Sequence, residues 1–502
     1  MILQKKTDVP LDEAMDIAGS GLYTTYVIFA TGFLLFASML NIEAMAMVLP
    51  AAGCDLKLSN TEKGMLTSTT FTGMVVAGPL AGFLSDAYGR KKLCAITQTI
   101  STLLLLLSSV APNHITLMAI NFVNGIVLTG SFTPAYVFVS EFSPQSIRAK
   151  GLIIATCISL LSNIILPGLA WLVLPLEMKT SIFGFITFTS WRLYIIIISI
   201  PMFISVVCFW RIPETPKFLL NKGDADGTLE ILKKIYAVNN KMKKEDFPVL
   251  NVVLDSSDEG YGENNEITNP FLKSVKDMIS RSKLLFSKEF VLYTLMSCIL
   301  LFSQVGSFYS YMLWFPEQLS RIKLFSTINE VYNVTLCDLM SSRYGTVEVI
   351  EDCQLNYDFF FYCILLGIVQ VFSALFVSVY ADRLGKKLLL ACILISTGII
   401  TAVVVFLTQE YLTIAALGFA IVDSSMGFPL IMALIMEYYP TYVRSTATAV
   451  AIIFGRLGAA VGSQIMGALF DNYCEPAYFG ICVILIASGL MCLVLPSKRK
   501  RS

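Results

Sequence analysis

Long apolar runs alternate with short polar stretches along almost the whole chain. Twelve runs have about the length of a bilayer-spanning helix, which is about 20 residues. The predicted spans are 22–49, 66–85, 93–111, 116–139, 150–175, 190–211, 289–314, 358–380, 388–408, 411–436, 446–470 and 475–496. This pattern predicts an all-α membrane protein with twelve transmembrane helices.

A long polar segment, 212–288, separates the sixth run from the seventh, so the helices divide into two groups of six. Its first part predicts an amphipathic helix, because Leu229, Leu232 and Tyr236 recur at helical spacing. The predicted domains are an N-terminal segment 1–21, a bundle 22–211, the central loop 212–288, a second bundle 289–496 with an outer loop 315–357, and a basic tail 497–502.

Composition and charge agree with a membrane location. Only 14% of the 502 residues are charged, whereas a soluble domain carries roughly 25%. Lys and Arg number 28 on the side that holds both predicted termini and 6 on the other side. Because basic residues concentrate in cytoplasmic loops, we expect both termini in the cytoplasm. The bilayer is the expected environment, and no nucleic-acid partner is predicted.

One charged turn occurs twice, as SDAYGRKK at 85–92 and as ADRLGKK at 381–387. The two copies are 296 residues apart. The matched positions are Asp86, Gly89 and Arg90 in the first copy and Asp382, Gly385 and Lys386 in the second. Each glycine permits a tight turn between two helices.

A second motif repeats at the same offset, with Glu141 and Arg148 matching Glu437 and Arg444. Two motifs at one offset indicate a duplicated six-helix unit. The acids and bases of both motifs could form ion pairs at a cytoplasmic gate, made in one state and broken in another. The alternative is that the basic residues only set the orientation in the membrane.

Three charges lie inside predicted spans, where charge is costly and usually functional. They are Glu43, Asp423 and Arg456. Arg456 could neutralise Asp423 in a structural pair, or it could attract an anionic solute. Glu43 is the candidate for proton coupling, because an apolar surrounding favours the neutral form of a carboxyl group.

Polar and aromatic side chains in the predicted spans are further candidates for solute binding. They are Asn41, Asn121, Asn124, Gln304, Tyr309, Tyr311 and Trp314. The alternative is that they hydrogen-bond neighbouring helices.

The predicted outer loop carries a glycosylation sequon at Asn333. Cys337 and Cys353 lie in the same loop and could form a disulfide; the alternative is two free thiols. The chain contains no phosphate-binding loop, zincin helix or nucleophile elbow. We therefore predict no enzyme activity, cofactor or metal.

These features together resemble the major facilitator superfamily. GFLSDAYGRKK is similar to the superfamily's signature loop between helices 2 and 3, and ADRLGKK is similar to its echo between helices 8 and 9. PETPKFLL at 213–220 resembles an element shared by organic-ion transporters and synaptic vesicle glycoprotein 2 relatives. SFYSYMLWFPEQL at 307–319 is similar to helix 7 of the latter. The resemblance implies two pseudo-symmetric six-helix bundles around a cavity lined by helices 1, 4, 7 and 10.

The sequence also departs from the family pattern. Asn121 stands where the superfamily usually has an Arg tied to proton coupling, which argues against such coupling. Ser159 replaces a ligand-stacking Trp, whereas Trp314 keeps its counterpart. The outer loop is short beside the luminal domain of the vertebrate vesicle proteins.

The predicted function is transport of a small organic solute, an organic ion or a sugar-like compound, by a monomer that alternates access. The transport would be secondary or facilitative, in the plasma membrane or a vesicle membrane. The alternative is a vesicle-membrane protein that acts in ligand binding or trafficking with little transport.

Overall fold

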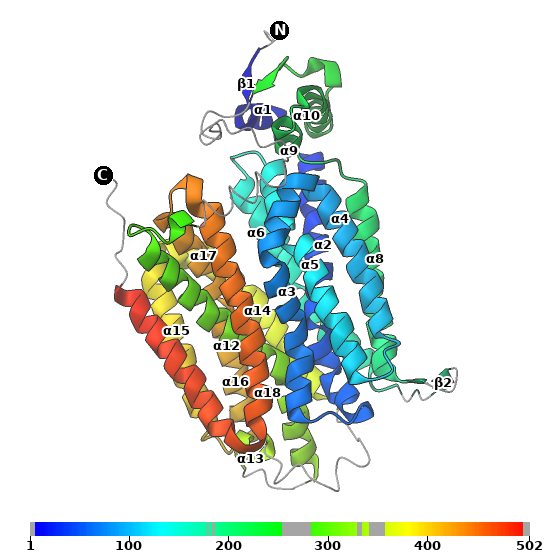
Figure 1. Cartoon of the computed structure of the whole chain (residues 1–502), viewed down its shortest axis with the longest axis vertical. Coiled ribbons are helices and arrows are strands. Elements are labelled where there is room, and N and C mark those ends of the chain that lie inside the picture. The colour runs from blue at the N-terminus through cyan, green and yellow to red at the C-terminus, as the bar shows by residue number, and fades with distance from the viewer. Residues whose placement is uncertain are drawn as a thin grey trace.

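The computed structural model describes residues 6–176, 178, 180–182, 186–253, 283–328, 334–340 and 357–494. Long helices run side by side and carry a small group of helices and strands at one end (Figure 1). Within the described residues, nine helical stretches are long and apolar enough to cross a membrane. Thr446–Val494 is one of them and contains two predicted spans, whereas α3 and α4 fall outside the set. The predicted all-α membrane fold is confirmed.

Six predicted spans form each half of the bundle. The first half comprises α2 (Leu22–Asp55), α3 (Asn60–Tyr88), α4 (Arg90–Ser108), α5 (His114–Phe142), α6 (Arg148–Leu160), α7 (Ser162–Val173) and α8 (Ser190–Trp210). The second half comprises α12 (Val291–Ile328), α14 (Phe359–Leu384), α15 (Lys386–Val404), α16 (Glu410–Ser425), α17 (Gly427–Tyr438) and α18 (Thr441–Val494). Shorter elements are α13 (Leu336–Met340) and a hairpin of β2 (Thr180–Ile182) with β3 (Ile186–Phe188). The non-helical backbone of Tyr473 divides α18 into the last two spans.

Two spans that the hydrophobic pattern predicts as single helices are each broken once. The breaks fall between α6 and α7, at Leu161, and between α16 and α17, at Met426. There the backbone N–H groups bond to carbonyls three residues back instead of four. Pro167 and Pro429 follow the breaks. Proline has no N–H and crowds the carbonyl four residues before it. The helical hydrogen-bond pattern is therefore interrupted close to each proline.

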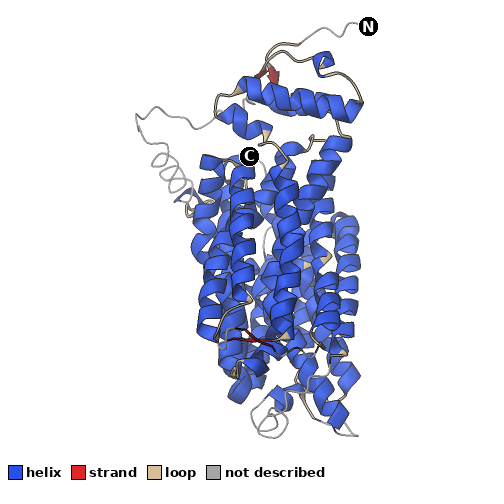
Figure 2. Cartoon of the chain, turned by 90° about the vertical axis from the view of Figure 1, so that its right-hand side faces the viewer, coloured by secondary structure: helices blue, strands red, loops and turns tan. Residues whose placement is uncertain are grey.

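The N-terminal segment and the central loop form one folded unit. We call residues 6–18 and 216–253 the cap, and the end of the bundle that carries it the cap end (Figures 1 and 2). The cap contains β1 (Val9–Pro10) paired in parallel with β4 (Val252–Val253), together with α1 (Leu11–Ala18), α9 (Pro216–Asn221), α10 (Ala225–Asn240) and a 3₁₀ turn at Lys244–Asp246. The predicted amphipathic helix is α10.

The apolar stripe of α10 holds the cap together. Leu232 and Tyr236 are buried, and Leu229 packs partly buried beside them. The sequence predicts 1–21 and 212–288 as separate segments, whereas the structure pairs them through a strand and through α1 against α10. The side chain of Asn239 accepts hydrogen bonds from the backbone N–H groups of Tyr23 and Thr24 at 2.9 and 3.3 Å. The cap therefore also supplies acceptors to the first turn of α2.

The most extensive contacts between the described parts of the two halves are those of α3 with α18, α7 with α14 and α2 with α12; α6 also contacts α14. Glycines allow the closest of these approaches. A Cβ added to Gly467 would lie 2.7 Å from Cα of Gly64. A Cβ added to Gly367 would lie 2.3 Å from the carbonyl oxygen of Asn163. Small residues of this kind let membrane helices pack backbone against backbone.

A disulfide joins Cys337 of α13 to Cys474 of α18, with the two Cα atoms 5.5 Å apart. The predicted pairing of Cys337 with Cys353 is therefore wrong. The hydropathy pattern could not reveal the true partner, because the turn within α18 brings together residues 137 positions apart. Cys353 and the sequon residue Asn333 lie outside the described residues.

Gly89 and Gly385 supply a prediction about the repeated turns. Both adopt positive φ, +103° and +84°, where an L side chain costs about 1–2 kcal/mol. A Cβ on Gly89 would also lie 2.3 Å from a carboxylate oxygen of Glu214, whereas a Cβ on Gly385 would have nothing within 4 Å. We expect Gly89→Ala to lower the melting temperature of the purified protein more than Gly385→Ala does. Equal shifts for the two variants would contradict this.

Candidate functional site

At the cap end, the repeated motifs form the same ion pair in each half. Arg90 Nη2 lies 3.3 Å from Glu141 Oε1 in the first half. Lys386 Nζ lies 2.6 Å from Glu437 Oε1 in the second. Each pair joins the start of one helix to the end of the next helix, and the two pairs are related by the 296-residue offset. The duplicated sequence thus corresponds to a duplicated contact.

Other predicted gate residues also contact groups of their own half. Arg90 bonds to Asp86 at 2.8 Å. Arg148 bonds at 2.8 Å to Asp12 of the cap. Arg444 Nε donates to a nearby backbone carbonyl, and the side chain of Asp382 is not among those described. Each of these cap-end ion pairs lies within one half or joins the first half to the cap.

At the opposite end, a buried ion pair does join the halves. Lys63 Nζ of α3 lies 2.6 Å from Glu317 Oε1 of α12, and both side chains are almost wholly shielded from solvent. Arg321 lies one turn beyond Glu317 and bonds to the same oxygen at 3.0 Å. Loss of one partner of a buried pair typically costs about 3–5 kcal/mol. This end is therefore closed by an ion pair that is strongly destabilised when only one of its two partners is removed.

Hydrogen bonds extend this closure along α3 and α18. Arg321 donates to Asn60 at 2.7 Å, and Asn60 donates to Asp471 at 2.5 Å. One turn inward, the Thr67 and Ser463 hydroxyls lie 2.7 Å apart. The sequence pattern did not reveal this network, because Lys63 and Arg321 entered the prediction only as basic residues of the outer loops. The spacing of Glu317 and Arg321, four residues apart in one span, was the available signal.

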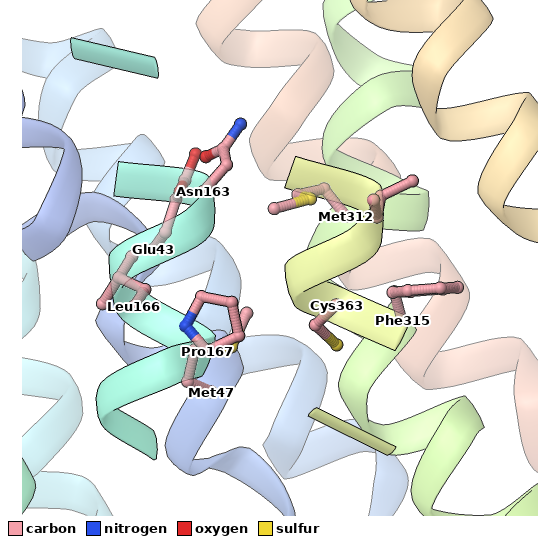
Figure 3. A pocket seen from close by; sticks show the side chains of 9 residues that line it. Glu43, Met47, Asn163, Leu166, Pro167, Met312, Phe315 and Cys363 are labelled. Atoms are coloured by element: carbon pink, nitrogen blue, oxygen red, sulfur yellow. The ribbon is translucent and has the colours of Figure 1, made fainter. Parts of the chain in front are cut away.

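Glu43 lies at the centre of the boundary between the halves. Its side chain is buried, and Oε2 has no hydrogen-bond partner among the described residues. The carboxyl lines a small cavity with Asn163 and Pro167 of α7, Met312 of α12 and Cys363 of α14 (Figure 3). The cavity volume is about 10 Å³, which is room for one water at most. A solute can reach Glu43 only after the helices around it move apart.

Arg456 also lies buried at the boundary. Its Nη2 donates to Thr133 of α5 at 2.8 Å, so α18 is linked to the first half. The described residues give it no carboxylate partner, and the predicted pairing with Asp423 is not formed. Tyr309 of α12 lies within electrostatic reach of both Arg456 and Glu43, and its ring packs 4.5 Å from that of Phe71 in the other half. An acidic and a basic side chain thus lie near the same aromatic residue.

Asp423 and Gln304 have partners inside the second half. The Asp423 carboxylate accepts hydrogen bonds from Ser396 and Thr397 of α15. The Gln304 amide donates to the backbone carbonyl of Ser424 beside the break in α16 and α17. These contacts favour the structural alternative for Asp423, whereas Gln304 Oε1 is buried without a partner among the described residues, so Gln304 stays a binding candidate.

Asn41 and Asn124 belong to a closed hydrogen-bond network. Asn124 Nδ2 donates to Asn41 Oδ1 at 2.8 Å, and Asn41 Nδ2 donates to Ser101 Oγ at 2.9 Å. Ser101 Oγ in turn donates to Asn124 Oδ1 at 2.7 Å. The three side chains satisfy one another between α2, α4 and α5. By contrast, Asn121 Nδ2 is buried without a partner among the described residues, so it keeps its place as a binding candidate.

Tyr311 and Trp314 are packing residues in this state. The Tyr311 and Thr401 hydroxyls lie 2.6 Å apart. Trp314 Nε1 donates to the carbonyl of Ser463 at 3.1 Å, and its ring meets Phe470 edge-on at 4.7 Å. Both aromatic side chains are wholly buried.

Asn124 and Asn121 form a matched pair for mutation, since both lie on α5. Asn124→Ala leaves Asn41 and Ser101 buried with fewer partners, which typically costs about 1–3 kcal/mol. We expect Asn124→Ala to lower the melting temperature and Asn121→Ala to leave it nearly unchanged. Thermal unfolding of the purified variants checks this, and a larger loss for Asn121→Ala would contradict it.

The chain is similar to two kinds of characterised protein. It is 25% identical to human synaptic vesicle glycoprotein 2B over 354 residues, which are 66% of this chain and 51% of that protein. The chain thus spans about half the length of that relative. It is 23% identical to organic cation/carnitine transporter 7 of Arabidopsis thaliana over 507 residues, which cover 98% of this chain and 94% of the transporter.

Solved structures share the fold. The partially occluded inward-open xylose transporter XylE from E. coli superposes with a TM-score of 0.66 at 14% identity, covering 94% of this chain and 98% of that one. A bacterial homolog of the human lysosomal transporter Spinster, in an inward-facing conformation, gives a TM-score of 0.62 at 12% identity and covers 96% and 100%. The Major Facilitator Superfamily model matches residues 31–330 and 360–502. The chain belongs to the Major Facilitator Superfamily.

Proposed function

We propose that this protein transports a small organic ion across a membrane by alternating access. The two halves move relative to each other about the centre of the boundary that contains Glu43 and Arg456. The transport is secondary or facilitative.

The observation that carries this proposal is the buried carboxyl of Glu43, whose Oε2 has no hydrogen-bond partner among the described residues. A buried charge or polar group without a partner is costly, and such groups inside membrane spans mark the paths of solutes or protons. Uptake of a proton, or contact with a cationic group of the solute, would remove that cost. Arg456 offers the complementary contact to an anionic group, so a solute with ionic groups fits the site better than a neutral sugar.

The ion pairs at the two ends of the bundle support a transport cycle. The ion pair of Lys63 with Glu317 holds the halves together at the end opposite the cap. At the cap end, the pairs of Arg90 with Glu141 and of Lys386 with Glu437 each lie within one half. The excess of Lys and Arg in the cap-end loops favours the cytoplasm as the compartment at that end. The conformation is then closed to the outside.

The relatives agree with an organic ion as substrate. The plant protein matched over 94% of its length is named as an organic cation/carnitine transporter. The XylE fold neighbours include a proton symporter of xylose, so proton coupling through Glu43 belongs to the proposal. Vesicle location and action as a monomer also remain proposals.

A transport assay with two carboxylate variants tests this function. Glu43→Gln keeps the size of the side chain and removes its charge. Asp423→Asn makes the same change in a span of the second half, where Ser396 and Thr397 already satisfy the side chain. In proteoliposomes supplied with panels of organic cations, organic anions and sugars, we expect Glu43→Gln to reduce uptake at least about tenfold, because charge-assisted hydrogen bonds contribute about 1.5–3 kcal/mol. Asp423→Asn should stay within about threefold of wild type.

Equal uptake by wild type and Glu43→Gln would refute the central role of Glu43. Solute binding by the wild type without any uptake would instead favour the alternative function, ligand binding with little transport. The comparison requires that both variants elute as monodisperse protein.

A further inference from the structure

A second cavity opens at the end opposite the cap, away from Glu43. Its volume is about 560 Å³, within the range of about 300–1,000 Å³ that is typical of ligand pockets. Trp171 of α7 forms the wall from the first half. The remaining lining residues lie at the ends of α12, α14 and α16 in the second half. The cavity therefore lies across the boundary between the halves.

The wall of this cavity already holds an ammonium group between aromatic rings. Lys323 Nζ lies 4.8 Å from the ring centre of Tyr362 and 5.3 Å from that of Tyr411. It also forms an ion pair with Glu410. Two ring faces and a carboxylate are the groups by which proteins recognise organic ammonium ions.

The lining carries charged groups of both signs, and its aromatic rings already hold a cation. The lining contains the carboxylates of Glu410 and Asp358 and the ammonium of Lys323. Tyr411 is 71% exposed, so its ring is accessible to a ligand from solution or from the lipid interface.

We propose that this cavity is a binding site for an organic ammonium ion, separate from the transport site at Glu43. The ligand ammonium lies against Tyr411 and Glu410, and it competes with Lys323 for the two rings and the carboxylate. Because the wall includes Trp171 of the other half, a bound ligand contacts both halves. It therefore favours the state in which this end is closed.

Choline serves as the probe, because it presents a quaternary ammonium group without a large apolar tail. Binding of radiolabelled choline is measured on the purified full-length protein in nanodiscs of phosphatidylglycerol. Lys323→Met removes the competing cation and should tighten binding at least about threefold, because an adjacent like charge opposes cation binding. Tyr411→Leu should weaken binding about 3-fold to 30-fold, and Tyr411→Phe, which keeps the ring face, should not.

Two comparisons decide the site and the source of the ligand. Glu43→Gln should leave choline binding at this cavity unchanged; a loss in that variant would place the binding at the transport site and overturn the proposal. Binding that is absent from both wild type and Lys323→Met, or that is weakened equally by Tyr411→Phe and Tyr411→Leu, would also overturn it. In nanodiscs of phosphatidylcholine, loss of soluble choline binding identifies a lipid headgroup as the occupant. Retained binding identifies a soluble amine, and both results support the ammonium site.

Discussion

We infer that the ion pair between Lys63 and Glu317 holds the two halves together at the end opposite the cap. It joins α3 to α12 across the boundary, and it lies almost wholly out of contact with solvent. In a low-dielectric surrounding neither charge is stable alone. The pair can therefore separate only when water reaches and solvates both charges. The glycine contact of Gly64 with Gly467 lets α3 and α18 approach closely enough for the neighbouring hydrogen bonds to form. Closure of this end therefore depends on charge and on close packing together.

The duplicated halves keep their turns and have diverged in their interiors. The pair of Arg90 with Glu141 has its counterpart in Lys386 with Glu437, 296 residues later. Gln98 and Asn124 in the first half correspond at the same offset to Leu394 and Ala420 in the second. The amide of Asn124 thus has an apolar counterpart in the second half, whereas its network partner Ser101 corresponds to the polar Thr397, which donates to Asp423.

The sequence predicts the parts of this structure that depend on local pattern. Hydrophobic length locates the spans, and the repeated charged turns predict the pairs at Arg90 and Lys386. The face that each helix presents is not predictable in this way, because a span that is apolar all round carries no signal for its orientation. For this reason the sequence could not predict that Asp423 and Trp314 contact helices of their own half. The cost of burying charge marks both Glu43 and Asp423 in the sequence, but among the described residues only Asp423 has hydrogen-bond donors for its carboxylate, whereas Glu43 Oε2 has no partner.

The most direct test of this account is a distance measurement across the end opposite the cap. Met65 of α3 and Ile465 of α18 are exposed and can carry spin labels as Met65→Cys and Ile465→Cys, after the free cysteines have been replaced by serine. Electron–electron double resonance on the wild-type background should give one short distance. Glu317→Gln should add a longer distance, whereas Glu410→Gln, which removes a carboxylate within the second half, should not. An unchanged distance distribution in Glu317→Gln would contradict the claim that this buried pair holds the two halves closed.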